Sequence, residues 1–186
     1  MNLPNALTWL RVGLIPVFVM FFLIPKEWGY TWTHIVVTAL FVIAAITDWL
    51  DGYLARKWNQ TSNFGAFLDP VADKLMVVAA IILIVYDAGQ KWYIVIPAIV
   101  IISREITISA LREWMATLGA RGVVAVSWIG KWKTAMQMVA LTCLLYKQPL
   151  FGINMYYVGL WGLLIATILT LWSMIQYLID AWKVLK

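Results

Sequence analysis

Charged residues, cysteine and histidine are all scarce in this sequence. Only 12% of its 186 residues are charged and 63% are hydrophobic, whereas a soluble globular domain carries about 25% charge. This balance excludes an ordinary water-soluble fold. The single cysteine, Cys143, excludes an intramolecular disulfide framework and a cysteine-rich zinc site. A net charge of +5 is better explained by basic residues on one side of a membrane than by nucleic-acid binding, so we expect no nucleic-acid partner.

Six stretches of at least 12 residues contain no charged residue, and they predict membrane-spanning helices. These stretches are residues 12–25, 29–47, 75–86, 92–103, 134–146 and 148–179. Several are shorter than the roughly 20 apolar residues that a span requires, so their helices must continue through flanking charged residues. No convincing small-residue cleavage site follows the first stretch, so we expect it to be retained. The sequence predicts an all-α fold, a six-transmembrane-helix bundle in which residues 1–186 form one integral membrane domain.

The basic residues predict which side of this bundle faces the cytoplasm. If the six helices alternate up and down, eleven of the 14 Lys and Arg fall on one side, against Lys26, Lys91 and Lys147 on the other. Because basic residues concentrate in cytoplasmic segments, the first side is expected to be cytoplasmic. We therefore expect a cytoplasm-facing polar cavity, in which ionisable groups are candidates for function.

Four of the nine acidic residues lie within residues 48–73. Asp48 and Asp51 are three residues apart and share one helix face. Asp69 and Asp73, four residues apart, share another. Four carboxylates in a low-dielectric cleft need compensating charge, and oxygen ligands without nearby His or Cys favour Mg²⁺ or Mn²⁺. The spacing predicts a site for two such ions, as used in phosphoryl chemistry.

Spacing alone leaves two other interpretations of these aspartates open. They could line a cation path in a transporter, or they could pair structurally with Arg56, Lys57 and Lys74. Few polar groups in residues 29–47 and 148–179 could continue a path to the far side, which argues against the transporter. His34, the only histidine, lies near the opposite interface, where we expect packing rather than catalysis.

Residues 48–73 resemble the signature of the CDP-alcohol phosphatidyltransferase family, D-x2-D-G-x2-A-R-x8-G-x3-D-x3-D. The matching positions are Asp48, Asp51, Gly52, Ala55, Arg56, Gly65, Asp69 and Asp73. That family consists of six-helix membrane enzymes with a cytoplasm-facing cavity, usually homodimers, so the resemblance extends to the whole chain. It implies that an alcohol hydroxyl displaces CMP from CDP-diacylglycerol, with two metal ions on the diphosphate.

The resemblance also implies roles for individual residues. Asp48 and Asp69 would bridge both metals, and Asp51 would complete one metal site. Asp73 would complete the other and act as the general base. The CDP-diacylglycerol site would include an N-terminal segment similar to the family's Pro-Asn-x-x-Thr, together with residues of and near the signature: Pro4, Asn5, Thr8, Gly52, Ala55, Arg56, Ser62 and Gly65. For the N-terminal segment an ordinary helix start is an open alternative.

A second basic set lies at the cytoplasmic ends of the fourth and fifth expected helices: Arg104, Arg112, Lys131 and Lys133. Arg104 and Arg112 are eight residues apart and therefore share a helix face. Such a set suits an anionic phosphate. The alternative is that these cations follow the positive-inside tendency and pair with acidic residues such as Glu105 or with lipid headgroups.

The segments around this basic set, SREITISALREW and GKWKT, closely resemble the bacterial family members whose acceptor is sn-glycerol 3-phosphate. The resemblance implies that substrate, a bacterial inner-membrane location among membrane lipids, and an active site facing the cytoplasm. Inositol phosphate, serine or a phospholipid as acceptor are the alternatives within the family.

Overall fold

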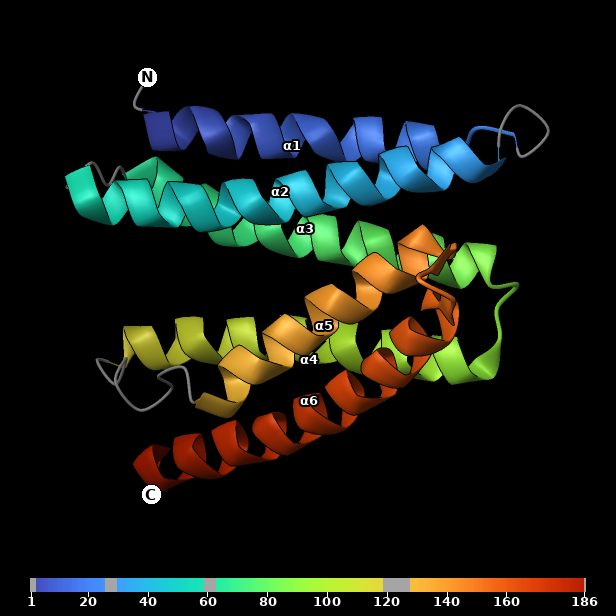
Figure 1. Ribbon diagram of the computed structural model, residues 1–186. Coiled ribbons are helices and arrows are strands. Elements are labelled where there is room, and N and C mark those ends of the chain that lie inside the picture. Colours follow the sequence, from blue (N-terminus) through green and yellow to red (C-terminus); the bar gives the residue numbers. More distant parts are fainter. Residues whose placement is uncertain (1–2, 26–29, 59–62, 119–127, 186) are drawn as a thin grey trace. The chain divides into compact units, whose positions relative to one another are not determined.

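The computed structural model describes residues 3–25, 30–58, 63–118 and 128–185, which form six helices and one short hairpin (Figure 1). The helices are α1 (Leu3–Phe22), α2 (Tyr30–Trp58), α3 (Asn63–Asp87), α4 (Trp92–Thr117), α5 (Trp128–Tyr146) and α6 (Met155–Leu185). Between α5 and α6, β1 (Pro149–Leu150) pairs antiparallel with β2 (Ile153–Asn154). The predicted all-α class with six helices is confirmed.

The helices continue beyond the uncharged stretches, as their length requires. α3 has 25 residues and runs through Asp69 and Asp73 before it reaches its apolar part. Among the described residues, three segments are long and apolar enough to cross a membrane: Trp32–Leu50, Trp92–Thr117 and Met155–Lys183. α1 contains a shorter apolar segment, Thr8–Phe22. The chain therefore has the helices of a multi-pass membrane protein.

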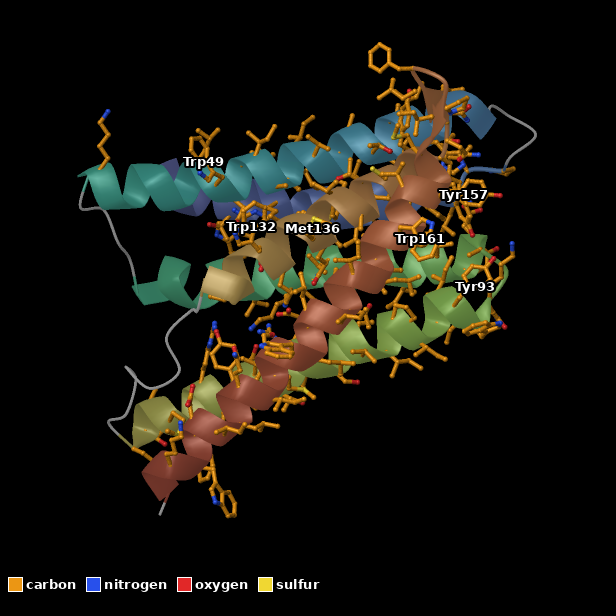
Figure 2. All side chains as sticks on the ribbon, turned by 60° about the horizontal axis from the view of Figure 1, so that its bottom comes forward. Trp49, Tyr93, Trp132, Met136, Tyr157 and Trp161 are labelled. Carbon is orange, nitrogen blue, oxygen red and sulfur yellow. The ribbon has the colours of Figure 1, made fainter. Side chains whose placement is uncertain are left out.

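Large aromatic side chains are exposed along these helices. Trp49 of α2, Trp132 of α5 and Trp161 of α6 are 66%, 54% and 65% exposed (Figure 2). Exposed apolar surface of this extent is unfavourable in water and normal against lipid. The distribution of side chains therefore agrees with the apolar helices in assigning the chain to a membrane.

The fold divides into two compact units. The first consists of Met1–Tyr86 and Leu145–Met155. In it α1 packs against α2, and the rings of Phe18 and Phe41 lie 6.3 Å apart. The buried His34 donates a hydrogen bond from Nδ1 to the carbonyl oxygen of Leu145 at 2.9 Å. This contact gives His34 a structural role between α2 and the end of α5.

The second unit consists of Asp87–Leu144 and Tyr156–Lys186. α4 and α6 meet in an apolar cluster formed by Ile108, Met115, Tyr177 and Ala181, with Leu111 and Met174 packed against it. α5 and α6 approach closely at Gly159, where an added Cβ would lie 2.8 Å from the backbone nitrogen of Leu144. These contacts pack α6 against both helices that carry the second basic set, α4 and α5. That residues 1–186 form a single domain stays a prediction.

Candidate active site

The predicted metal ligands come from α2 and α3 of the first unit. Asp48 and Asp51 belong to α2, and Asp69 and Asp73 belong to α3, so each pair has the helical spacing that the sequence indicates. The side chains of Asp51 and Asp69 lie outside the described residues. Within the described part of the chain no three His, Cys, Asp or Glu side chains converge. The metal site therefore stays a prediction.

One described carboxylate of this set, that of Asp48, is held by an arginine of α1. Arg11 Nη1 donates to Asp48 Oδ1 at 2.7 Å, and the two side chains are 1% and 42% exposed. α1 begins at Leu3, so Arg11 lies inside the helix and not at its flank. Sequence reasoning missed this pair because Arg11 entered it only as one of the eleven basic residues on the cytoplasmic side. A charge within an apolar helix, on the same predicted side of the membrane as the aspartates, was the available signal.

The predicted nucleotide-binding residues are only partly described. Thr8 is buried in α1, in the second turn and not at the helix start. All of Ser62 lies outside the described residues. For the other members, which belong to helices, only the helical backbone is described: Pro4, Asn5, Gly52, Ala55, Arg56 and Gly65. Their roles stay predictions.

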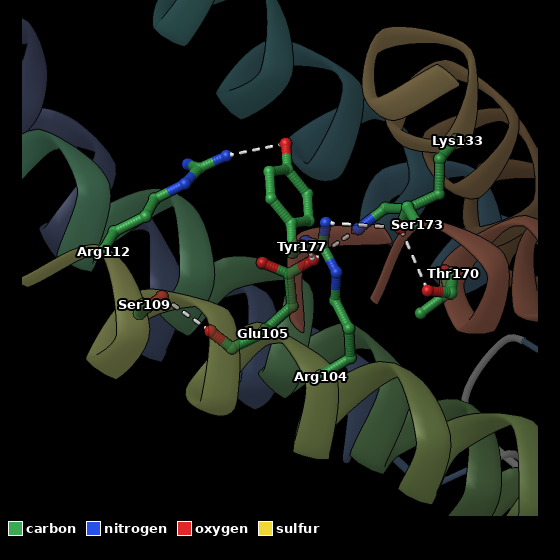
Figure 3. Close-up of polar contacts among 8 residues, drawn as sticks. All are labelled: Arg104, Glu105, Ser109, Arg112, Lys133, Thr170, Ser173 and Tyr177. Carbon is green, nitrogen blue, oxygen red and sulfur yellow. Dashed lines mark hydrogen bonds and ion pairs between the residues drawn. The ribbon is translucent and has the colours of Figure 1, made fainter. Parts of the chain in front are cut away.

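Two residues of the second basic set, Arg104 and Lys133, meet at one carboxylate. Glu105 Oε1 accepts hydrogen bonds from Arg104 Nη1 at 3.0 Å and from Lys133 Nζ at 2.6 Å (Figure 3). Arg104 and Lys133 are buried. These two cations come from α4 and α5, in agreement with the expectation that the basic set lies on the fourth and fifth helices. Lys131 belongs to α5, but its side chain lies outside the described residues.

α6 is the third helix that contributes side chains to this group. Arg112 Nη2 donates to the hydroxyl of Tyr177 at 3.2 Å, and Arg104 Nη2 donates to Ser173 Oγ at 3.5 Å (Figure 3). The guanidinium carbons of Arg104 and Arg112 lie 5.7 and 5.5 Å from the centroid of the Tyr177 ring, within the range of a cation–π contact. Ser173 in turn donates to the carbonyl oxygen of Thr170 at 3.0 Å. We call Arg104, Glu105, Arg112, Lys133, Ser173 and Tyr177 the basic cluster.

The basic cluster carries a formal charge of +2, from three cations and one carboxylate. Its buried Arg104 Nε has no hydrogen-bond partner among the described residues, so that side chain retains a donor for an anion. Several charged donors that converge in this way suit an anionic group with many acceptor oxygens. The pairing with Glu105, weighed as an alternative to anion binding, is real, but it neutralises only one of the three cations.

Sequence reasoning missed the two α6 members of the basic cluster. Thr170, Ser173 and Tyr177 follow each other at three- and four-residue steps on one face of α6. A polar stripe of this kind on an apolar helix indicates a polar neighbour inside the protein. This polar stripe was the sequence signal that could have identified α6 as the third helix of the site.

Comparison with known proteins agrees with the motif. Residues 1–174 match the model of the CDP-alcohol phosphatidyltransferase family. The chain is similar to the CDP-diacylglycerol–glycerol-3-phosphate 3-phosphatidyltransferase of Haemophilus influenzae, with 58% identity over 95% of this chain and 91% of the relative. The enzymes of that name from Shigella flexneri and Escherichia coli are 52% and 51% identical, over 95% of this chain and 93% of each relative. The chain therefore belongs to the CDP-alcohol phosphatidyltransferase family.

Proposed function

We propose that the chain transfers the phosphatidyl group of CDP-diacylglycerol to sn-glycerol 3-phosphate, which yields phosphatidylglycerophosphate and CMP. The observation that carries this proposal is the basic cluster of the second unit, in which Arg104 and Lys133 bond Glu105 and Arg112 bonds Tyr177. Relatives that are 51–58% identical along nearly the whole chain bear the name of this activity. A divalent-cation transporter has no comparable support.

The charge of the basic cluster favours a phosphorylated acceptor. A phosphate monoester carries about −1.5 to −2 at neutral pH, which a site of formal charge +2 can neutralise. Hydrogen bonds from charged donors are among the strongest in proteins, and arginine presents its donors in a planar arrangement that matches phosphate. Serine offers no phosphate to these donors, and glycerol offers none either. The cluster therefore supports glycerol 3-phosphate over both.

The aspartates of α2 and α3 fit two divalent ions, because all four supply hard carboxylate oxygens, the ligands that Mg²⁺ and Mn²⁺ prefer. Asp48, Asp51, Asp69 and Asp73 would hold the ions, which when bound neutralise the diphosphate of the donor lipid. Arg11 fixes the orientation of the Asp48 carboxylate through its ion pair. This orientation lowers the cost of assembling the site, because fewer side-chain rotamers must be frozen.

The residues of the chain also account for the proton balance of the transfer. The acceptor hydroxyl oxygen forms a bond to the phosphatidyl phosphorus, while the bond from that phosphorus to the bridging oxygen breaks and the oxygen leaves with CMP. Asp73 would take the proton of the acceptor hydroxyl, provided that the hydroxyl is docked within hydrogen-bond reach. Holding the two reactants in place is expected to supply much of the rate enhancement.

The proposed activity also requires a membrane location that both substrates can reach. The excess of eleven basic residues over three supports the cytoplasmic face for the active side, and the bacterial relatives support the inner membrane. The acyl chains of the donor remain in the bilayer, and glycerol 3-phosphate arrives from the cytoplasm. The enzyme works as a homodimer, as is usual in its family.

An acceptor panel tests the proposed function. The purified protein in detergent is given CDP-diacylglycerol with glycerol 3-phosphate, glycerol, serine or inositol phosphate, and the release of CMP is measured. We expect CMP release with glycerol 3-phosphate, its loss in excess chelator, and its return with Mg²⁺ or Mn²⁺. Equal release with serine or inositol phosphate would contradict the acceptor assignment. Full activity in chelator would contradict the two-metal site.

A further inference from the structure

Tyr177 of α6 occupies an unusual position for a core tyrosine, because it contacts two cations as well as the apolar core. Its side chain is 5% exposed and packs in the cluster with Ile108 and Met115. One face of its environment is therefore apolar. The other is formed by Arg104 and Arg112, whose guanidinium groups lie 5.7 and 5.5 Å from the ring centroid.

The two arginines differ in how strongly the rest of the protein holds them. Arg104 is buried and also bonds Glu105 and Ser173. Arg112 is exposed, and its contacts to Tyr177 are a hydrogen bond of 3.2 Å and the ring face. An exposed arginine samples many rotamers, and fixing such a side chain on binding costs free energy. Tyr177 removes part of that cost before any ligand arrives.

We propose that Tyr177 is a positioning residue for the acceptor phosphate, which it acts on through Arg112 and Arg104 without touching the phosphate itself. The inference rests on the proposed function. The hydroxyl orients Arg112, and the ring keeps the two guanidinium groups beside each other despite their like charge, because the negative face of an aromatic ring attracts cations. α6 thereby completes a site whose cations come from α4 and α5. Tyr177 lies beyond residues 1–174, the part that matches the family model.

Removal of the hydroxyl alone separates this role from core packing. Tyr177→Phe keeps the ring and its apolar contacts but removes the acceptor for Arg112. We expect the KM for glycerol 3-phosphate to rise roughly three- to tenfold, the scale of one partly immobilised side chain. The KM for CDP-diacylglycerol and kcat should stay near their original values. Tyr156→Phe, on the same helix but with its ring against Tyr157, is the matched control and should leave all three constants unchanged.

A double-mutant cycle tests whether Tyr177 acts through Arg112. If Tyr177 acts through Arg112, Tyr177→Phe should raise the KM for glycerol 3-phosphate no further in an Arg112→Ala background. If Tyr177 had only a structural role, Tyr177→Phe would lower thermal stability and kcat. It would have the same effect in the Arg112→Ala background. Such persistence, or an unchanged KM in Tyr177→Phe, would overturn the inference.

The same cycle distinguishes failure of the inference from failure of the proposed function. If Arg112→Ala raises the KM for glycerol 3-phosphate and Tyr177→Phe does not, the acceptor site stands and Tyr177 has no part in it. If neither Arg112→Ala nor Arg104→Ala changes that KM, the basic cluster is not the acceptor site, and the proposal for Tyr177 falls with it. Calorimetric titration of each variant with glycerol 3-phosphate, in the absence of the donor lipid, measures the binding step directly.

Discussion

At the scale of single residues, the buried charges in the described part of the chain take part in ion pairs. Arg11 is held against Asp48, and Lys133 is held against Glu105. A buried charge without a partner costs several kcal/mol, so each pair depends on both members. Each pair also includes a residue with a proposed function, Asp48 as a metal ligand and Lys133 as a hydrogen-bond donor to phosphate. Stability and function are therefore coupled at these positions.

Replacement of Arg11 tests the first pair. Arg11→Met keeps much of the side-chain volume but removes the charge, so we expect a loss of about 1 to 2 kcal/mol in the free energy of unfolding. This value is below the usual cost of breaking a buried pair, because Asp48 is 42% exposed and can be solvated. Denaturant unfolding in detergent measures it. The control is Lys183→Met, which breaks the exposed pair with Asp180 and should cost less than about 0.5 kcal/mol. Equal losses in the two variants would contradict a special role for Arg11.

Glu105 gives a second prediction at this scale. Glu105→Gln leaves Arg104 and Lys133 facing each other without a counter-charge, so the protein should lose roughly 2 to 3 kcal/mol of stability. Glycerol 3-phosphate should stabilise this variant more than the original protein, because its phosphate replaces the missing negative charge. Thermal unfolding with and without the ligand measures both effects. An equal shift in the two proteins would show that the ligand does not bind near Glu105.

At the scale of elements, the helices could be predicted from the sequence because apolar runs and charged flanks are long-range compositional features. The motif on α2 and α3 could be predicted because helical spacing alone relates Asp48 to Asp51 and Asp69 to Asp73. In the short hairpin between α5 and α6, β1 and β2 have two residues each, too few for an alternating strand pattern to show in the sequence. In this hairpin Phe151 has a φ of 52° and Gly152 a φ of 79°, a pair of values that suits a tight hairpin turn.

The contact between α5 and α6 gives a prediction for an element. Gly159→Ala would put a Cβ 2.8 Å from the backbone nitrogen of Leu144 and 2.9 Å from the carbonyl oxygen of Ala140. Backbone atoms cannot move aside cheaply, so the helices must separate, and we expect a loss of about 1 to 3 kcal/mol. Gly13→Ala in α1 is the control, because nothing lies within 4 Å of the added Cβ. Unfolding in detergent should show Gly159→Ala as clearly less stable and Gly13→Ala as unchanged or more stable.

At the scale of the whole molecule, the sequence predicted the composition of the site better than its contacts. Arg104, Arg112 and Lys133 were expected on chemical grounds, and the structure gathers them. Tyr177 and Arg11 were not expected, because their partners lie 65 and 37 residues away in the chain. Contacts of that separation depend on how helices pack, which periodicity within one helix does not encode.

Binding of the acceptor phosphate by the basic cluster is tested most directly by the Michaelis constants of one variant. In Arg104→Ala a charge-assisted contact worth about 1.5 to 3 kcal/mol is lost, so the KM for glycerol 3-phosphate should rise roughly 10- to 150-fold. The KM for CDP-diacylglycerol should change little. Lys91→Ala, an exposed lysine at the other end of α4, should leave both constants unchanged. A parallel rise of both constants in Arg104→Ala, or no rise in either, would contradict the account.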